Sequence, residues 1–227
     1  MVSAEWNEAS ERHEYGWTGD RPGPKAEADA LEEYNRSHDI HHGYLRGAAM
    51  ELSGELVVRP GWTLVLTGKE YSAPIGSLRS GASAPSPGDR IRIIAPADAP
   101  AIQSLINGSL SDFPENRVSL AAVREDLFGT DSYGFILESS GEDVAFGHAY
   151  IDGRSGEINW VCVRADRQGH GFGKRTLNLL IGHLAEVGVE KVGLWMASKT
   201  PWAGRFYESA GFKEFAGRIC FLTYDRL

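Results

Sequence analysis

The stretch from Val161 to Lys174 carries residues whose types and spacing could bind a phosphorylated ligand. An apolar run typical of a strand leads into a glycine-rich turn, and the residues after the turn have the apolar spacing of an amphipathic helix. The first N–H groups of a helix lack partners within it and lie at the positive end of its dipole, so we expect an anion at this turn. Gly169, Gly171 and Gly173 would let a bulky pyrophosphate approach the backbone, and Lys174 adds positive charge.

Two well-known phosphate-binding patterns do not fit these glycines. A dinucleotide loop needs Gly-x-Gly-x-x-Gly, whereas the spacing here is Gly-x-Gly-x-Gly. A nucleoside-triphosphate loop needs Gly-x-x-x-x-Gly-Lys-Ser/Thr, but Gly173-Lys174 is followed by Arg175 and position 168 is Gln. A glycine-rich helix start without a ligand is the alternative to an anion site.

Gln168-x-x-Gly171-x-Gly173, between a strand and a helix, resembles the acyl-CoA loop of the GNAT superfamily, the general-control-type N-acetyltransferases. The stretch from Ala203 to Phe212 is similar to the late Ala-x-x-Phe-Tyr-x-x-x-Gly-Phe signature of that family. The resemblance covers residues 88–227. One position departs from it, because the family often has Asn three residues before this alanine and the chain has Thr200.

The expected elements of residues 88–227 alternate strands with helices. We expect strands near 90–94, 133–138, 144–151, 157–163, 189–197 and 214–224, and helices near 98–108, 120–127, 177–184 and 202–209. This order predicts an α/β fold with one mixed sheet. The resemblance implies a GNAT-like, mostly antiparallel central sheet flanked by helices, with an N-terminal extension.

The composition of residues 72–89 is that of a linker, rich in Gly, Pro, Ser and Ala, so we place a domain boundary near residue 87. Residues 88–227 are then the GNAT acyltransferase domain, and 1–87 an extension of unknown role. Within the extension we expect a helix over 25–36 and a hairpin of strands 55–58 and 63–67. We interpret the first 20 or so polar residues as disordered. No internal repeat is visible in the sequence.

The resemblance implies acetyl-CoA as co-substrate, with no metal. Its pantetheine amides would pair with the backbone near Val161 and Val163, where strand 157–163 splays from strand 189–197. The backbone N–H near Val161 would polarise the thioester carbonyl. The remaining expected cofactor-binding residues are Gln168, Gly169, His170, Gly171, Phe172, Gly173, Lys174 and Thr200.

Acyl transfer to an amine needs a base for the amine and an acid for the departing thiolate. Tyr207 matches the usual general acid of the family. Glu157 stands eleven residues before Gln168, where histone-type members have a catalytic glutamate; a water chain in place of Glu157 stays open. Strand alternation would put Glu157, Asn159, Val161 and Val163 on one face, and Cys162 on the other.

Composition limits the remaining choices. The net charge of −8 lacks the basic surface of a nucleic-acid binder, and neither an apolar run of about 20 residues nor a secretory signal is present. Two cysteines cannot form a disulfide framework, which favours the cytoplasm. His38, His41 and His42 lack the companions of a metal site, and Cys162 and His148 are interpreted as structural residues.

Our leading hypothesis is therefore an acetyl-CoA-dependent N-acetyltransferase that acts on a primary amine by direct transfer in a ternary complex. The acceptor would be a small amine or a protein amino group, and a homodimer is left open. The acidic charge favours a cationic acceptor. One alternative is a GNAT-like transferase that uses a carrier-bound acyl donor. The other is a catalytically silent acyl-CoA-binding regulatory module.

Overall fold

The structure is a computed structural model, and it describes residues 2–7, 12–17, 23–40, 42–78, 88–109, 117–197 and 201–226. Contacts between residues divide the chain into two compact units. The first unit contains residues 1–70, 196–204 and 214–227, and the second contains residues 71–195 and 205–213.

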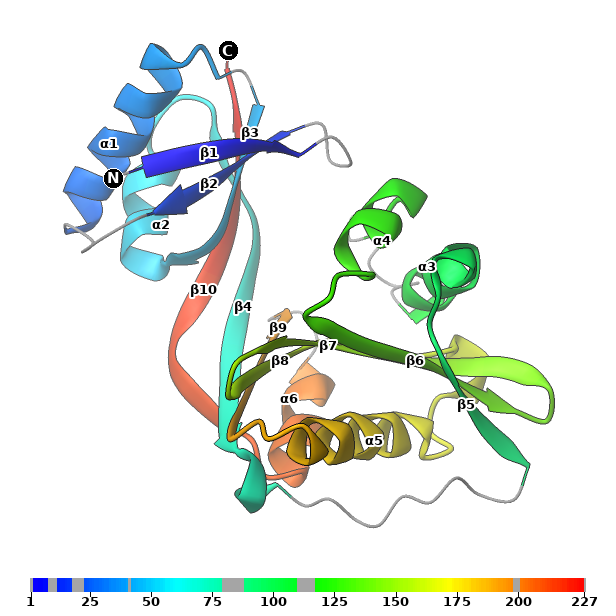
Figure 1. Ribbon diagram of the computed structural model, residues 1–227. Helices are drawn as coiled ribbons and strands as arrows, with labels where there is room; N and C mark the ends of the chain where they lie inside the picture. Colours follow the sequence, from blue (N-terminus) through cyan, green and yellow to red (C-terminus); the bar gives the residue numbers. More distant parts are fainter. Residues whose placement is uncertain are drawn as a thin grey trace. The chain divides into compact units, whose positions relative to one another are not determined.

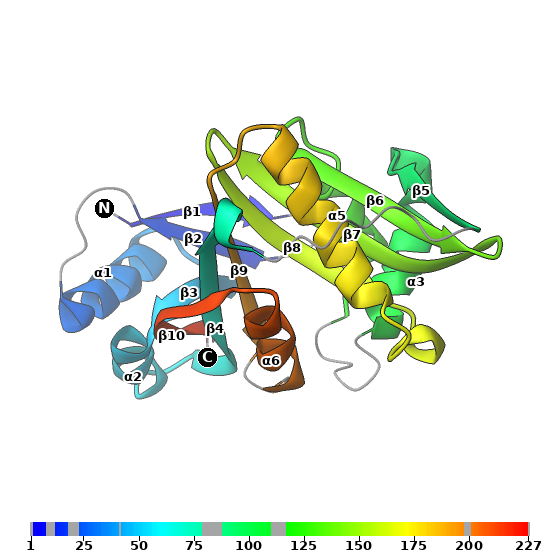
Figure 2. The ribbon, with the colours of Figure 1, turned by 90° about the horizontal axis from the view of Figure 1, so that it is seen from below.

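The second unit is built on a mixed sheet with helices on both faces. Its strands β5 (Asp89–Ile93), β6 (Ser132–Ser139), β7 (Glu142–Asp152) and β8 (Ser155–Val163) pair antiparallel in that order, and β9 (Lys191–Ala197) pairs parallel with β8. Helix α5 (Phe172–Glu186) covers one face of the sheet, while α3 (Ala99–Ser109) and α4 (Leu120–Asp126) cover the other (Figures 1 and 2). The expected α/β fold with a mostly antiparallel sheet is confirmed.

Apolar spacing explains why each helix lies where it does. Helix α5 buries Leu177, Leu180, Ile181 and Leu184, which recur at the three- and four-residue intervals of one helix face. Burying side chains of this kind contributes about 1.5–3 kcal/mol each. On the opposite face, Ile102, Leu105 and Ile106 of α3 form one cluster with Val123 of α4 and Phe146 of β7. On both faces, therefore, the helices pack on the sheet through apolar side chains whose spacing is visible in the sequence.

The expected order of elements in residues 88–227 is confirmed to the end of the chain. Short 3₁₀ turns η2 (Pro96–Asp98) and η4 (Ala165–Arg167) precede α3 and α5. Helix α6 (Pro201–Ser209) follows β9, and a single strand β10 (Lys213–Asp225) comes last. Helix α5 ends just before Gly188, which has a φ of +86°, and the N–H of Val189 donates to the Leu184 carbonyl oxygen at 3.0 Å in the helix-ending turn.

Residues Tyr71–Leu78 pack inside the second unit, although we predicted a linker over 72–89. They form the end of β4 (Trp62–Pro74) and the 3₁₀ turn η1 (Ile75–Ser77). The N–H of Ile75 donates to the Glu190 carbonyl oxygen at 2.8 Å, and a Cβ on Gly211 would lie 3.0 Å from the Ser77 carbonyl oxygen. Leu78 is buried. The linker prediction is thus wrong for 72–78, while its residues 79–87 lie outside the described residues.

The first unit contains more regular structure than the sequence indicated. Strands β1 (Val2–Asn7) and β2 (Arg12–Trp17) pair antiparallel where we predicted disorder. Strand β2 pairs parallel with β3 (His42–Ala49), β3 pairs antiparallel with β10, and β10 lies beside β4. The predicted helix is confirmed as α1 (Pro24–Ser37).

Helix α2 (Met50–Val57) replaces the strand that we predicted over 55–58, so the hairpin prediction is wrong. Leu52 and Leu56 are four residues apart and share one helix face, where they join Leu31 of α1 and Trp62 of β4 in the core of the first unit. Arg59 after the helix pairs with Asp29 and Glu32 of α1 at 2.8 and 3.1 Å, which adds ionic contacts to the apolar ones.

The same order of elements occurs twice in the chain. The order strand, strand, helix, strand, helix, strand describes β1-β2-α1-β3-α2-β4, and it returns as β7-β8-α5-β9-α6-β10. In both copies the first two strands pair antiparallel, and the third pairs parallel with the second. The repeat is therefore one of topology, in a chain whose sequence shows no repeat.

Candidate functional site

The turn between β8 and α5 has the open backbone that an anion site requires. Gly169 and Gly171 have φ values of +77° and +82°, in the left-handed region that other residues rarely adopt. A Cβ added to either would meet nothing within 4 Å. The dihedral angle, and not crowding, calls for glycine here, and the space beside the turn is free of described protein atoms at that distance.

Helix α5 begins directly at this turn with Gly171 as its N-cap. No side chain caps the helix, and its first turn carries no acidic residue. The first hydrogen bond of the helix runs from the N–H of Arg175 to the Gly171 carbonyl oxygen, at 3.1 Å. The preceding N–H groups of Phe172, Gly173 and Lys174 are therefore left for an external acceptor. Together with the helix dipole, these donors make the turn suited to an anion.

The side chains of the turn hold its shape. The amide nitrogen of Gln168 donates to the Val163 carbonyl oxygen at 3.3 Å, and His170 Nδ1 lies 2.8 Å from the Gln168 carbonyl oxygen. The Arg175 guanidinium lies 5.1 Å from the centre of the Phe172 ring and pairs with Asp89. Lys174 is exposed on the same helical turn. Thr200 lies outside the described residues.

Acidic partners engage two arginines that precede the turn. Arg164 pairs with Asp166 at 2.7 Å and with Glu142 at 2.8 Å, and Arg167 reaches the same Glu142 carboxylate at 2.7 Å. Hydrogen bonds from these guanidinium groups lower the pKa of Glu142, and Arg164 lowers that of Asp166. These arginines therefore stabilise the turn through the β7 end of the sheet.

The parallel pairing of β8 with β9 ends part of the way along both strands. It runs from Ser155 opposite Lys191 to Ile158 opposite Leu194. At the same point the pairing of β8 with β7 shifts, because Ile158 is opposite Ala149 whereas Trp160 is opposite His148. Asn159 is the extra residue of a β-bulge, which turns the rest of β8 and alters which face its side chains occupy.

The bulge corrects our prediction that Glu157, Asn159, Val161 and Val163 share one face. Opposed residues of neighbouring strands lie on the same face of a sheet. Val161 is opposite Gly147, where an added Cβ would lie 2.8 Å from Thr176 of α5, so Val161 faces α5. Val163 also faces α5, with Cγ2 3.6 Å from an added Cβ on Gly173.

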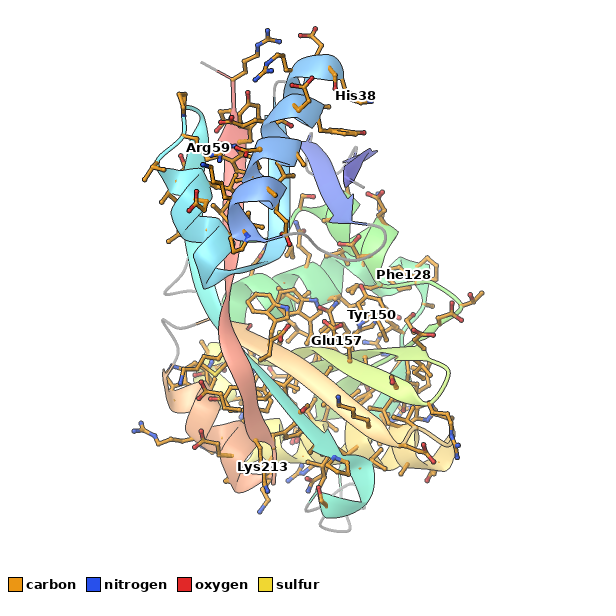
Figure 3. All side chains as sticks on the ribbon, turned by 90° about the vertical axis from the view of Figure 1, so that its left-hand side faces the viewer. His38, Arg59, Phe128, Tyr150, Glu157 and Lys213 are labelled. Carbon is orange, nitrogen blue, oxygen red and sulfur yellow. The ribbon has the colours of Figure 1, made fainter. Side chains whose placement is uncertain are left out.

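Glu157 instead faces the layer of α3 and α4. It is opposite Tyr150, whose hydroxyl group donates to the Asp126 carbonyl oxygen at the end of α4, at 2.9 Å. Cys162 lies on this same face, opposite Phe146 and within the α3 cluster, and not on the face opposite Glu157 as predicted. Figure 3 labels Tyr150 and Glu157 on their adjacent strands in the second unit.

Asn159 joins Glu157 on the α4 side. Its amide nitrogen donates to the Tyr150 hydroxyl oxygen at 3.3 Å. Sequence reasoning assigned no role to Tyr150 or Asn159. The tight turn between β7 and β8 would have placed Tyr150 opposite Glu157, but no sequence signal marks residue 159 as a bulge.

Tyr207 lies in an aromatic group within the second unit. Its ring centre is 6.5 Å from that of Tyr71, 5.0 Å from Phe206 and 6.0 Å from Phe212. Burial raises the pKa of the Tyr207 phenol, and the nearby Cys162 thiol adds to the rise, so the hydroxyl group keeps its proton at neutral pH. Phe206 comes within 3.8 Å of an added Cβ on Gly173, which brings this helix to the start of α5.

Two titratable side chains are buried on the face that carries Glu157. Burial raises the pKa of the Cys162 thiol to about 12, despite a hydrogen bond with Ser109. Burial lowers the pKa of His148 to about 4, although the Leu127 carbonyl opposes that shift, and neither ring nitrogen has full hydrogen-bond geometry with a described atom. Both groups are neutral near pH 7, as expected of structural residues.

The described residues contain neither a metal-binding cluster nor a helix that could span a membrane. No cluster of three or more His, Cys, Asp or Glu side chains could hold a metal ion in that part of the chain. His38, from the predicted histidine group, stacks on Tyr34 with ring centres 3.9 Å apart, and His41 lies outside the described part. No helix among these residues is both long and apolar enough to span a bilayer.

Comparison with protein families gives one match. Residues 100–212 match the family described as the Acetyltransferase (GNAT) family. This range includes all of α3 except Ala99, the bulge, the glycine-rich turn and the whole of α6. No curated protein matches the chain.

Solved structures with the same fold cover most of the chain at low identity. A GCN5-related N-acetyltransferase from Kribbella flavida has 17% identity and a TM-score of 0.65, over 100% of this chain and 87% of that one. A tandem GNAT protein from the clavulanic acid biosynthesis pathway has 17% identity and a TM-score of 0.63, over 94% and 75%. The ribosomal-protein-S18-alanine N-acetyltransferase from Escherichia coli has 21% identity and a TM-score of 0.52, over 60% and 93%. These likenesses establish the fold.

Proposed function

Since the chain belongs to the GNAT acetyltransferase family through residues 100–212, we propose that it transfers the acetyl group of acetyl-CoA to a primary amine. The transfer is direct, in a ternary complex. The observation that carries the proposal is the open, glycine-bent turn at the start of α5. The strand that leads to this turn, β8, stops pairing with β9 after Ile158.

The residues at this turn fit the pyrophosphate of acetyl-CoA. The N–H groups at the start of α5 are unused by the helix, the left-handed glycines leave open space, and the exposed Lys174 adds positive charge. Past the end of the β8–β9 pairing, the backbone of Val161 and Val163 is available in our proposal to the pantetheine amides. The N–H near Val161 would then polarise the acyl carbonyl group.

Bound acetyl-CoA supplies an activated thioester. We assign Glu157 as the base that accepts a proton from the amine as the C–N bond forms. Its exposed carboxylate on the α4 face suits a base that exchanges protons with solvent. A water between Glu157 and the amine would serve the same path.

Tyr207 is the proposed general acid, which donates its proton to sulfur as the C–S bond breaks. Its raised pKa supports this role because the phenol is protonated throughout the neutral range. Proton exchange with water then returns Tyr207 and Glu157 to their starting states. The acidic net charge of the chain supports a cationic acceptor, a small amine or a protein amino group.

Release of free CoA thiol from acetyl-CoA, measured with a panel of primary amines, tests this proposal. We expect thiol release that depends on both the amine and the enzyme, and an acetylated amine detected by mass spectrometry. Tight acetyl-CoA binding with no release for any amine would favour a silent regulatory module. Activity only with a carrier-bound acyl donor would favour the other alternative.

We further propose a cytoplasmic enzyme in which residues 1–87, apart from the segment 71–78 that packs within the second unit, act on acceptor selection or self-association and not on acetyl-CoA. Local substitutions within the first unit should then change the acceptor KM or the mass in solution while the acetyl-CoA affinity stays constant. An unchanged acceptor KM and mass would argue against this role.

A further inference from the structure

The bulge at Asn159 places a polar side chain next to the proposed base. Glu157 stands two residues before Asn159, and both lie on the α4 side of the second unit. Tyr150 of β7 lies opposite Glu157 and accepts a hydrogen bond from Asn159. A bulge re-aims side chains, and it is common beside active sites. The question is which end of the Asn159 amide is presented to a bound molecule.

The hydrogen bonds of Tyr150 settle the orientation of that amide. The Asp126 carbonyl oxygen can only accept, so the Tyr150 hydroxyl proton is directed to it at 2.9 Å. The Tyr150 oxygen must then accept from Asn159, which turns the NH2 group of the amide toward Tyr150 at 3.3 Å. The amide oxygen Oδ1 of Asn159 consequently points away from Tyr150, and it makes no hydrogen bond to any residue in the described part of the chain.

We propose that Asn159 positions the acceptor by accepting a hydrogen bond from its amino group through Oδ1. This inference rests on the proposed function, because it concerns the amine that Glu157 deprotonates. A protonated primary amine has three N–H groups. One gives its proton to Glu157, which passes it to solvent, and this leaves a neutral amine with a lone pair and two N–H groups. One of these N–H groups donates to Asn159 Oδ1, which limits rotation of the nitrogen and its lone pair, while the other loses its proton to Glu157 as the C–N bond forms.

Tyr150 is the positioning residue in this arrangement, because it acts on the acceptor through Asn159. Its own location is fixed at both ends. The ring packs edge-on against the buried His148 ring with centres 4.9 Å apart, and the hydroxyl group is tied to the last residue of α4. The loop that follows α4 is also bonded to β7, since the Ile151 N–H donates to the Asp131 carbonyl oxygen at 2.7 Å.

The test compares Asn159→Ala, Asn159→Asp and Tyr150→Phe in the full-length chain, with spermidine, tyramine and an Ala-Gly-Ala tripeptide as acceptors. The acceptor that gives the wild type its highest kcat/KM is used throughout. Asn159→Ala removes the acceptor oxygen and should raise the amine KM by about 10-fold or more, the effect of losing a hydrogen bond to a charged group. The acetyl-CoA dissociation constant should stay within about threefold, because Asn159 is not among the residues at the turn.

Asn159→Asp is the conservative variant that separates positioning from a structural role. Its carboxylate still offers an oxygen to the amine but cannot donate to the Tyr150 hydroxyl group, so the amine KM should remain close to that of the wild type. Tyr150→Phe keeps the ring but removes the hydroxyl group that orients the Asn159 amide, so it should raise the amine KM by a few-fold. If Asn159→Asp and Tyr150→Phe damage the enzyme as much as Asn159→Ala does, the contact is structural and the inference is wrong.

Two further results would also count against the inference. An unchanged amine KM in Asn159→Ala, in an enzyme whose wild type is active, overturns the role of Asn159 and leaves the proposed function intact. A wild type that releases no CoA thiol with any of the three amines while it binds acetyl-CoA overturns the proposed function together with the inference. Unfolding curves of all three variants confirm that folded protein is compared.

Discussion

Residues 2–74 and 142–225 contain the same succession of strands and helices, yet the helix that follows the second strand starts differently in each. Helix α5 begins after Gly171 in the left-handed region and has no acidic residue in its first turn. Helix α1 begins after Gly23 at φ −66°, with Pro24 at its first position and Glu27 in its first turn. A proline nitrogen has no hydrogen to donate, and a carboxylate occupies the positive end of the dipole.

This difference teaches that the order of helices and strands specifies only the scaffold. The backbone conformation and the residue types at the start of a helix decide whether that helix can bind an anion. The first turn of α5 has backbone N–H groups that the helix does not use, and it also carries the basic residues Lys174 and Arg175. The first turn of α1 has one N–H group fewer, because of Pro24, and it carries the negative charge of Glu27. We therefore expect the proposed acetyl-CoA site to lie in the second copy alone. Four experiments can break or sharpen that assignment.

Removal of residues 1–87 should have the largest effect, because it takes away Tyr71–Leu78 along with the first copy. These residues pack within the second unit against Glu190, Tyr207 and Gly211. We expect chain 88–227 to lose acetyl-CoA binding and its cooperative unfolding transition. Chain 71–227, which retains them, should keep measurable binding by calorimetry. Equal binding by both chains would show that the second unit does not need this segment.

Tyr207→Phe should lower kcat by about 10²–10⁴-fold, the usual contribution of a positioned general acid. Acetyl-CoA affinity should change little, because the phenol acts on sulfur only as the bond breaks. Steady-state kinetics and calorimetry measure the two quantities. Tyr34→Phe, on α1 of the first copy, is the matched control and should keep the wild-type rate. A wild-type kcat for Tyr207→Phe would reduce Tyr207 to a packing residue.

Gly171→Asp should weaken acetyl-CoA binding by about 100-fold, equivalent to about 3 kcal/mol. The aspartate brings a carboxylate to the anion site and a Cβ to a left-handed residue. The corresponding change in the first copy, Gly23→Asp, should leave the affinity unaltered, since an ordinary φ and open space accept the side chain. Comparable losses in both variants would place part of the cofactor site in the first copy.

The smallest expected effect concerns stability in acid. Because burial lowers the pKa of His148 from 6.5 to about 4, the unfolded chain takes up this proton at a higher pH than the folded chain. Stability is therefore fully present above about pH 6.5 and is lost as the pH falls toward 4, by up to about 3 kcal/mol. Urea unfolding at pH 7.5 and 4.5 should show this loss in the wild type and a smaller one in His148→Met.

The sequence predicted the second unit well because its signals are local. The apolar stripe of α5 with Gly188 after it, and the Ser119 N-cap that accepts from the Ala122 N–H at 3.0 Å, each specify an element from neighbouring residues. The glycine-rich turn could also be predicted from the sequence, because glycine is the residue that most readily adopts a positive φ.

The errors have tertiary causes. Residues 55–58 are rich in residues that favour strands, but Leu52 and Leu56 gain a shared core with α1 when the segment is helical. The composition of residues 72–78 resembles a linker because small residues dominate. Their contacts with the second unit order them as the end of β4 and the turn η1. The bulge at Asn159 depends on how β8 pairs with both β7 and β9, so strand alternation placed Val161, Val163 and Cys162 on the wrong faces relative to Glu157.

The pairing of β10 with β3 has a consequence for biosynthesis. Ile219 lies opposite Ala49 and Asp225 opposite His42, so the sheet of the first unit joins strands that are about 170 residues apart in the sequence. A ribosome releases residues 42–49 long before it has made 219–225. The edge of β3 that pairs with β10 must then stay uncovered until residues 219–225 have been synthesised, which exposes it to mispairing or to chaperones during that interval.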